Sequence, residues 1–171
     1  SFDTFVDFLD SGLEFVSIKE HLSFSKHSNN KCAITFDDGL KDIYTVAYPE
    51  LKKRNIPFTV FIIVNYLNKD GYLTSDELLT LSKDPLVTIA SHGMTHHVLK
   101  GLPREKQEYE LCESKKALER LTNCSIDYFA YSHGGFDETT LNILENTKLY
   151  RFAFGVARST TNIITKRRQY F

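Results

Sequence analysis

Three short clusters in the sequence contain residue types that can bind a metal ion or move protons. The first is Asp37-Asp38-Gly39, the second runs from Ser91 to His97, and the third is Ser132-His133-Gly134-Gly135. Four of the six histidines lie in the second and third clusters. One aspartate with two histidines is a frequent ligand set for a catalytic zinc that keeps a position open for water. The chain could therefore hold a catalytic divalent ion.

The spacing of His92 and His96 is the first argument for a metal site. On a helical turn, two histidines four residues apart lie on one face and can bind one ion. Such pairs also arise by chance, so the carboxylates of the first cluster are needed to support the interpretation. Because successive strand residues point in opposite directions, one of Asp37 and Asp38 can bind metal while the other points elsewhere. In isolation, Asp37-Asp38-Gly39 also fits a plain turn at the end of a strand.

The three clusters each follow a short apolar segment with the composition of a buried strand. A further segment, 58–64, is nearly continuous in β-branched and aromatic residues, which is typical of a parallel strand buried on both faces. We expect strands over 14–18, 32–36, 58–64, 86–90, 128–131 and 150–154.

Helical patterns alternate with these strands. A capping box at 74–77 opens one helix, and Asp137 is expected to cap another that runs to 146. Further helices are expected over 2–9, over 41–54 with an interruption at Pro49, and over 104–122. This alternation predicts one α/β domain with parallel strands in a barrel or an open sheet. The clusters should converge, because the carboxyl ends of parallel strands open onto one rim.

The composition is that of an ordinary folded domain. The 171 residues are 42% hydrophobic and 25% charged, which excludes disordered, collagen-like and disulfide-scaffold classes. A net charge of −1 predicts no nucleic-acid partner. The three cysteines contain no C-x-x-C pair, so no disulfide framework or thiolate zinc site is indicated. We find no signal peptide at the start and no apolar run of the about 18 residues that a membrane helix needs.

The segments around the three clusters resemble the motifs of a known family. The segments 34–39, 91–96 and 129–134 are similar to the first three motifs of the polysaccharide deacetylases, the NodB-homology group or carbohydrate esterase family four. The segment 48–61 resembles the stretch that joins the first two motifs, and the match covers roughly 31–154. The most similar branch contains the poly-N-acetylglucosamine and surface-polysaccharide deacetylases.

The resemblance implies both a fold and an activity. The fold would be the distorted (β/α) barrel of the NodB type. The activity would be a hydrolase that removes N-acetyl groups from a bacterial cell-surface polysaccharide or its precursor. It would use one divalent ion, with zinc expected and cobalt, nickel or manganese as options. The partner would be an N-acetylated glycan, and the compartment either the bacterial cytoplasm or the cell envelope.

The resemblance also assigns roles to individual residues. Asp38, His92 and His96 would bind the metal, and Asp37 would be the catalytic base. The third motif would supply a backbone N–H for the oxyanion at His133. The expected substrate-binding residues are Tyr131, Ser132 and Gly134, with Tyr131 and Phe136 as candidates to stack on a sugar.

The sequence departs from the family pattern at informative positions. Gly93 stands where many members have Ser or Thr, and Ser132-His133 replaces Pro-Tyr of the third motif. The C-terminal leucine-histidine motif, which carries the general acid in many members, is absent. In the most similar branch this histidine precedes the first motif. We therefore expect that residues 1–171 are a single catalytic domain shortened at one or both ends, or that His133 supplies the acid.

Two alternatives to an active deacetylase stay open. One is a catalytically degenerate or truncated domain of this type that binds glycan. The other is a hydrolase of non-sugar amides on the same scaffold, some of which work without metal. The intact Asp-His-His set favours the metal-dependent deacetylase.

Overall fold

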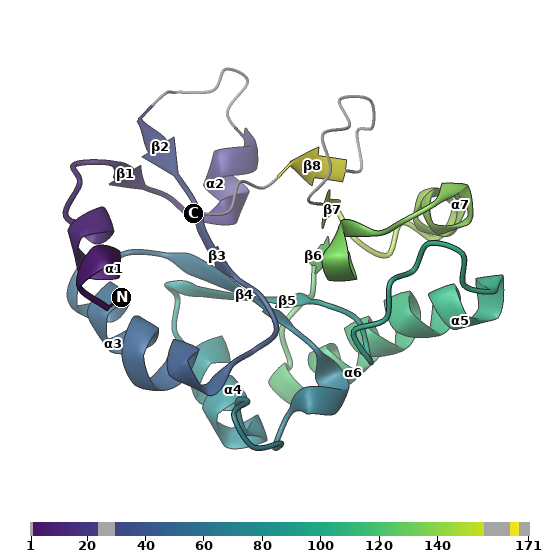
Figure 1. The fold of residues 1–171 in the computed structure, drawn as a ribbon, viewed down its shortest axis with the longest axis horizontal. Coiled ribbons are helices and arrows are strands. Elements are labelled where there is room, and N and C mark those ends of the chain that lie inside the picture. The colour runs from purple at the N-terminus through teal and green to yellow at the C-terminus, as the bar shows by residue number, and fades with distance from the viewer. Residues whose placement is uncertain (1, 24–29, 156–164, 168–171) are drawn as a thin grey trace.

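A curled sheet of six parallel strands forms the centre of the protein (Figure 1). The computed structural model describes residues 2–23, 30–155 and 165–167. The strands follow one another across the sheet in chain order, β3-β4-β5-β6-β7-β8, so each pairs with the next strand of the sequence. Their bounds are β3 (Ile34–Phe36), β4 (Phe58–Ile62), β5 (Val87–Ser91), β6 (Tyr128–Ala130), β7 (Phe152–Gly155) and β8 (Thr165–Arg167). The prediction of an α/β fold with parallel strands is confirmed.

Helices lie in the connections between successive strands from β3 to β7. The segments 43–53 and 104–122 each contain a π-helical turn, at Ile43–Ala47 and Tyr109–Glu113. The helices are α1 (Phe2–Leu9), α3 (Tyr48–Lys53), α4 (Ser75–Ser82), α5 (Arg104–Glu108), α6 (Ser114–Thr122) and α7 (Glu138–Thr147). The predicted capping box is present at Thr74 with Glu77, and the predicted cap Asp137 forms a second capping box with Thr140. Among the described residues, no helix has the length and apolar character needed to cross a membrane.

The two π-helical turns correct the helix predictions. The predicted interruption at Pro49 is wrong, because Pro49 lies in the first turn of α3 and the helical run continues through it. The irregularity lies just before it, where the N–H of Tyr48 bonds to Ile43 O in the π-helical turn. In the second helical run, the inserted residue of the π turn rotates the remainder of the helix by about 100°. Tyr109 is consequently 47% exposed, whereas Glu110 and Leu111 are buried.

A small second sheet corrects the prediction for the N-terminal third. Strand β1 (Glu14–Phe15) pairs with β2 (Lys31–Cys32), so the expected strand 32–36 is divided between two sheets. Ile18, expected in a strand, instead begins helix α2 (Ile18–Ser23). Ser17 and Glu20 cap this helix reciprocally: each accepts from the other's backbone N–H, at 3.2 and 2.9 Å. Most of the segment between α2 and β2 lies outside the described residues.

Strand β4, between β3 and β5, is buried on both faces, as its composition predicts. Phe58, Val60 and Ile62 pack in a large apolar cluster with residues of α3, α4 and α6. These helices lie along the outer side of the curled sheet in Figure 1. Phe61 points to the other side, where Ile18 of α2 belongs to the same cluster. This burial makes β4 a fixed support for the strands on either side of it.

Candidate metal centre at the carboxyl ends of the strands

The turn after β3 presents the carboxylate of Asp38. The N–H of Gly39 donates to Asp37 O at 2.9 Å around Asp38, whose φ is 69°, as in a γ-turn with positive φ. Gly39 has φ +73°, and a Cβ there would lie 3.1 Å from Ile62 Cδ1. This turn separates Asp37 from Asp38. The expectation that strand alternation does so is wrong, because the strand ends at Phe36.

His92 follows β5 directly and is held by two bonds. Its N–H donates to Ile62 O at 2.8 Å, and its Nδ1 lies 2.8 Å from Ala130 O. A carbonyl oxygen can only accept, so Nδ1 carries the proton and Nε2 presents a lone pair. The side chain is 4% exposed. His92 therefore has the tautomer and the fixed orientation that a metal ligand needs.

His96 reaches the same point from a loop. The segment 92–99 is not helical, and His96 itself has φ 65°. The helical-turn argument for the His92–His96 pair is therefore wrong. Convergence at the rim of the parallel sheet, predicted independently, is confirmed.

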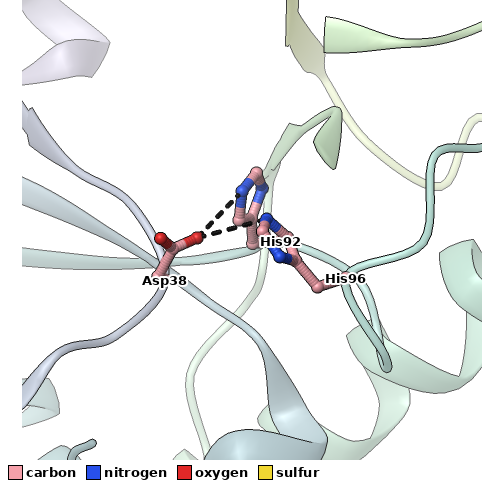
Figure 2. A group of neighbouring side chains, drawn as sticks. All are labelled: Asp38, His92 and His96. Carbon is pink, nitrogen blue, oxygen red and sulfur yellow. Dashed lines mark ion pairs between the residues drawn. The ribbon is translucent and has the colours of Figure 1, made fainter. Parts of the chain in front are cut away.

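The three side chains meet at one point in Figure 2. Asp38 Oδ1 lies 3.4 Å from Nε2 of His92 and 3.4 Å from Nε2 of His96. One ligand atom from each residue lies within 4.8 Å of the others, and within the described residues no other group of His, Cys, Asp or Glu meets this test. Two imidazoles and one carboxylate are a donor set of catalytic zinc sites. The Asp38 and His96 side chains are 35% and 22% exposed, so the group remains accessible from one side.

The electrostatics of the cluster favour the protonation states of metal ligands. The contact with the neighbouring His92 side chain is the largest cause that lowers the pKa of Asp38. Partial burial, followed by the neighbouring His92, lowers the pKa of His96. Both shifts favour an ionised carboxylate beside a neutral imidazole.

The loop after β6 brings His133 to the same rim. Its ring centroid lies 4.7 Å from that of His96, and the residue is exposed, with φ 53°. Inside this loop the N–H of Gly134 donates to Tyr131 O at 2.8 Å and that of Gly135 to Ser132 O at 3.2 Å. All three strand-end clusters therefore converge, each with a non-glycine residue at positive φ.

Two of the expected substrate contacts lie under the surface. Tyr131 is 2% exposed, and its ring packs against Phe129 and Phe136 at centroid distances of 5.5 and 4.6 Å. Against expectation, this ring has no face to offer a sugar. Ser132 is 3% exposed, and its hydroxyl donates to His92 O at 3.4 Å. Gly134 and Phe136 remain partly exposed.

An aromatic residue that the sequence patterns do not single out lies beside the group of Asp38, His92 and His96. The Tyr66 ring is 6.3 Å from that of His96 and 4.9 Å from that of Tyr72. The N–H of Leu73 donates to Gly39 O at 2.9 Å, which ties this connection to the Asp38 turn. No local pattern could reveal Tyr66, since its place depends on pairing between two distant turns.

Comparisons with known proteins find similar chains. A family model described as polysaccharide deacetylase matches residues 25–152. YxkH of Bacillus subtilis (strain 168), classed with the polysaccharide deacetylases, is 32% identical over 142 residues, 81% of this chain and 50% of that protein. A poly-beta-1,6-N-acetyl-D-glucosamine N-deacetylase of Staphylococcus aureus (strain MRSA252) is 27% identical over 166 residues, 87% and 57% of the two chains. The chain thus spans about half the length of these curated relatives.

Solved structures show the same fold. The Streptococcus pyogenes deacetylase PplD, in complex with acetate, has a TM-score of 0.78 at 26% identity, over 90% of this chain and 70% of that one. IcaB from Ammonifex degensii has a TM-score of 0.80 at 25% identity, over 91% and 76%.

Proposed function

The chain belongs to the polysaccharide deacetylase family and has the distorted (β/α) barrel of that family, and on this premise we propose that it is a metal-dependent N-deacetylase. Its substrate is a bacterial cell-surface polysaccharide or a precursor of one. The convergence of Asp38, His92 and His96, with Asp37 beside them, carries the proposal. The name of the Staphylococcus aureus relative supports the substrate class, and the acetate complex of PplD supports the product.

Asp38, His92 and His96 are the residues that would hold the ion. The neutral His92 imidazole, oriented by Ala130 O, and the ionised Asp38 carboxylate suit zinc. Cobalt, nickel and manganese are the alternative ions to compare. Such an ion, when bound, polarises the acetyl carbonyl and lowers the pKa of water.

Asp37 is assigned as the general base. It lies close enough to His96 for its negative charge to act on that imidazole. Its carboxylate takes the proton of the attacking water as the tetrahedral centre forms. Asp37 and Asp38 thus divide proton transfer and metal binding between neighbouring positions.

His133, in the loop after β6, is assigned two tasks. The N–H groups of Gly134 and Gly135 bond within their own turn, which leaves the His133 N–H as the expected donor to the oxyanion. The exposed His133 imidazole beside His96 donates the proton that the departing amine requires. We place the sugar ring near Tyr66 and Phe136, the partly exposed aromatic residues of this rim.

Acetate release from N-acetylglucosamine oligomers tests the proposal. Protein supplied with zinc or cobalt is compared with protein treated with a chelator. We expect activity only with metal, and an about 10²–10⁴-fold lower kcat for Asp37→Asn with metal binding retained.

The two alternatives predict other outcomes of this assay. Metal binding without acetate release from any glycan would indicate a domain that only binds glycan. Hydrolysis of simple amides in preference to these oligomers would indicate the non-sugar hydrolase.

A further inference from the structure

A buried carboxylate lies against the loop that carries His96. Glu110 is 4% exposed. Its Oε2 accepts from the N–H of Met94 at 2.7 Å and from that of Thr95 at 3.0 Å. The Thr95 hydroxyl donates to Oε1 of the same carboxylate. Glu110 therefore binds the two residues that precede His96 by three separate donors.

The π-helical turn Tyr109–Glu113 brings Glu110 to this position. The carbonyl of Glu110 accepts from Ser114 Oγ at 2.5 Å, and Ser91 Oγ donates to that hydroxyl at 2.8 Å. Ser91 is the last residue of β5, the strand that leads to His92. The helical run and the metal-ligand segment are thus joined at both the backbone and the side chain of Glu110.

The shape of the loop depends on this carboxylate. Gly93 has φ +86°, and a Cβ there would lie 2.8 Å from Glu110 Oε2. The carboxylate therefore occupies the space that a side chain at position 93 would need. The loop is held from the helix rather than by a side chain of its own at that position.

Burial of the Glu110 carboxylate favours the one loop conformation that supplies all of its hydrogen bonds. A buried carboxylate is unfavourable unless its oxygens are fully hydrogen-bonded. Three donors of the loop, all from Met94 and Thr95, meet the two oxygens of Glu110. The loop must keep its observed conformation to supply all three. That conformation includes His96 at φ 65°, which surrounding contacts must maintain.

We propose that Glu110 is a positioning residue for the metal centre, holding the 93–96 loop so that His96 Nε2 faces Asp38 and His92. The inference rests on the proposed function for the presence of a metal at these three ligands. It adds a residue of the helical run, outside the strand-end clusters, to the machinery of the site.

Equilibrium binding of Co²⁺ tests the inference, because the visible absorption of bound Co²⁺ reports its coordination. Glu110→Ala is expected to bind Co²⁺ at least tenfold more weakly, in line with the about 10–100-fold cost of outer-shell changes, and with an altered spectrum. Gln107→Ala is the matched control. Gln107 lies one turn earlier in the same helical run and is also buried, but its amide donates to Leu102 O. This variant should lose thermal stability and keep wild-type Co²⁺ affinity.

Each outcome decides a different question. A Glu110→Ala variant that binds Co²⁺ like wild type, with the same spectrum, would overturn the inference. If that variant does not fold, Glu110→Gln decides, because one carboxylate oxygen is replaced by an NH2 group, which donates hydrogen bonds and cannot accept them. A severalfold loss in Glu110→Gln supports the inference, and unchanged affinity overturns it. No Co²⁺ binding by the wild type would refute the proposed metal site and this inference together.

Discussion

The two sides of the rim hold their residues in different ways. On the side of β3 and β5, His92 is 4% exposed and bonded to two carbonyls, and Glu110 secures the loop of His96. On the side of β6, His133 is exposed on a short turn that is closed by backbone hydrogen bonds. Side-chain geometry is thus fixed on the side to which we assign the metal. It is freer on the side to which we assign the contacts with substrate.

Because of this difference, we expect substitutions on the two sides to change different properties of the protein. A change on the β3–β5 side should act on metal affinity, because orientation of the ligands is what that side provides. A change on the β6 side should act on turnover, since its groups meet the substrate. Substitutions on each side can test this division. The largest effect is expected when a metal ligand is removed, and the smallest when one helix cap is weakened.

Replacing one histidine on each side should give the largest difference in zinc affinity between two variants. His92→Ala deletes a ligand, so its zinc affinity should fall by more than the about 100-fold that outer-shell changes reach. His133→Ala keeps all three ligands and should bind zinc like wild type, with kcat lowered by about 10²-fold or more. Competition with a chromophoric chelator measures both affinities. Equal loss of zinc in the two variants would break the division.

Substitutions at two glycines with positive φ distinguish the effect of backbone strain from the effect of displacing the site. Gly39→Ala should destabilise the protein by about 1–2 kcal/mol, because the left-handed backbone disfavours a Cβ. Its Cβ would also press on Ile62 at 3.1 Å and displace the Asp38 turn, which should weaken zinc binding. Gly12 has φ +80° with nothing within 4 Å of a Cβ. Gly12→Ala should therefore show similar strain in urea unfolding with unchanged zinc affinity, and a matching loss of affinity would contradict this account.

The smallest expected effect is the loss of folding stability at low pH through Asp137, which caps the helix that follows the His133 loop. Asp137 caps α7 and accepts from the N–H of Gly101 at 2.7 Å; this bond is the main cause that lowers its pKa from 3.8 to about 2. Because the folded-state pKa is depressed, the stabilisation is complete above pH 3.8 and is lost as the pH falls toward about 2.

Asp137→Asn tests this acid dependence. The variant should be less stable by up to about 1 kcal/mol at pH 7, and its stability should converge with that of wild type near the lower pKa. Urea unfolding at several pH values measures the difference. A gap that stays constant down to the lowest pH would contradict the assignment.

Features fixed by short-range chemistry could be predicted from the sequence. The composition of 58–64 predicted a strand buried on both faces, and the residues at Thr74 and Asp137 predicted the observed caps. The three strand-end clusters were expected to converge because parallel topology brings strand ends together, and they do.

Features that depend on distant partners could not be predicted. The strand at 32–36 divides because β2 pairs with β1, a segment whose strand character is only two residues long. The place of Tyr66 depends on the bond from Leu73 to Gly39. In the sequence, Glu110 is one of several charged residues of an expected surface helix. It is buried because it lies in the π-helical turn Tyr109–Glu113, which the sequence pattern does not indicate.

X-ray absorption at the zinc edge of the zinc-loaded protein tests the central claim most directly. The account predicts one zinc per chain bound by two imidazole nitrogens at about 2.0–2.1 Å and a carboxylate oxygen at about 2.0–2.2 Å. A sulfur ligand at about 2.3 Å, or no stoichiometric zinc, would contradict the assignment of Asp38, His92 and His96 as the metal centre.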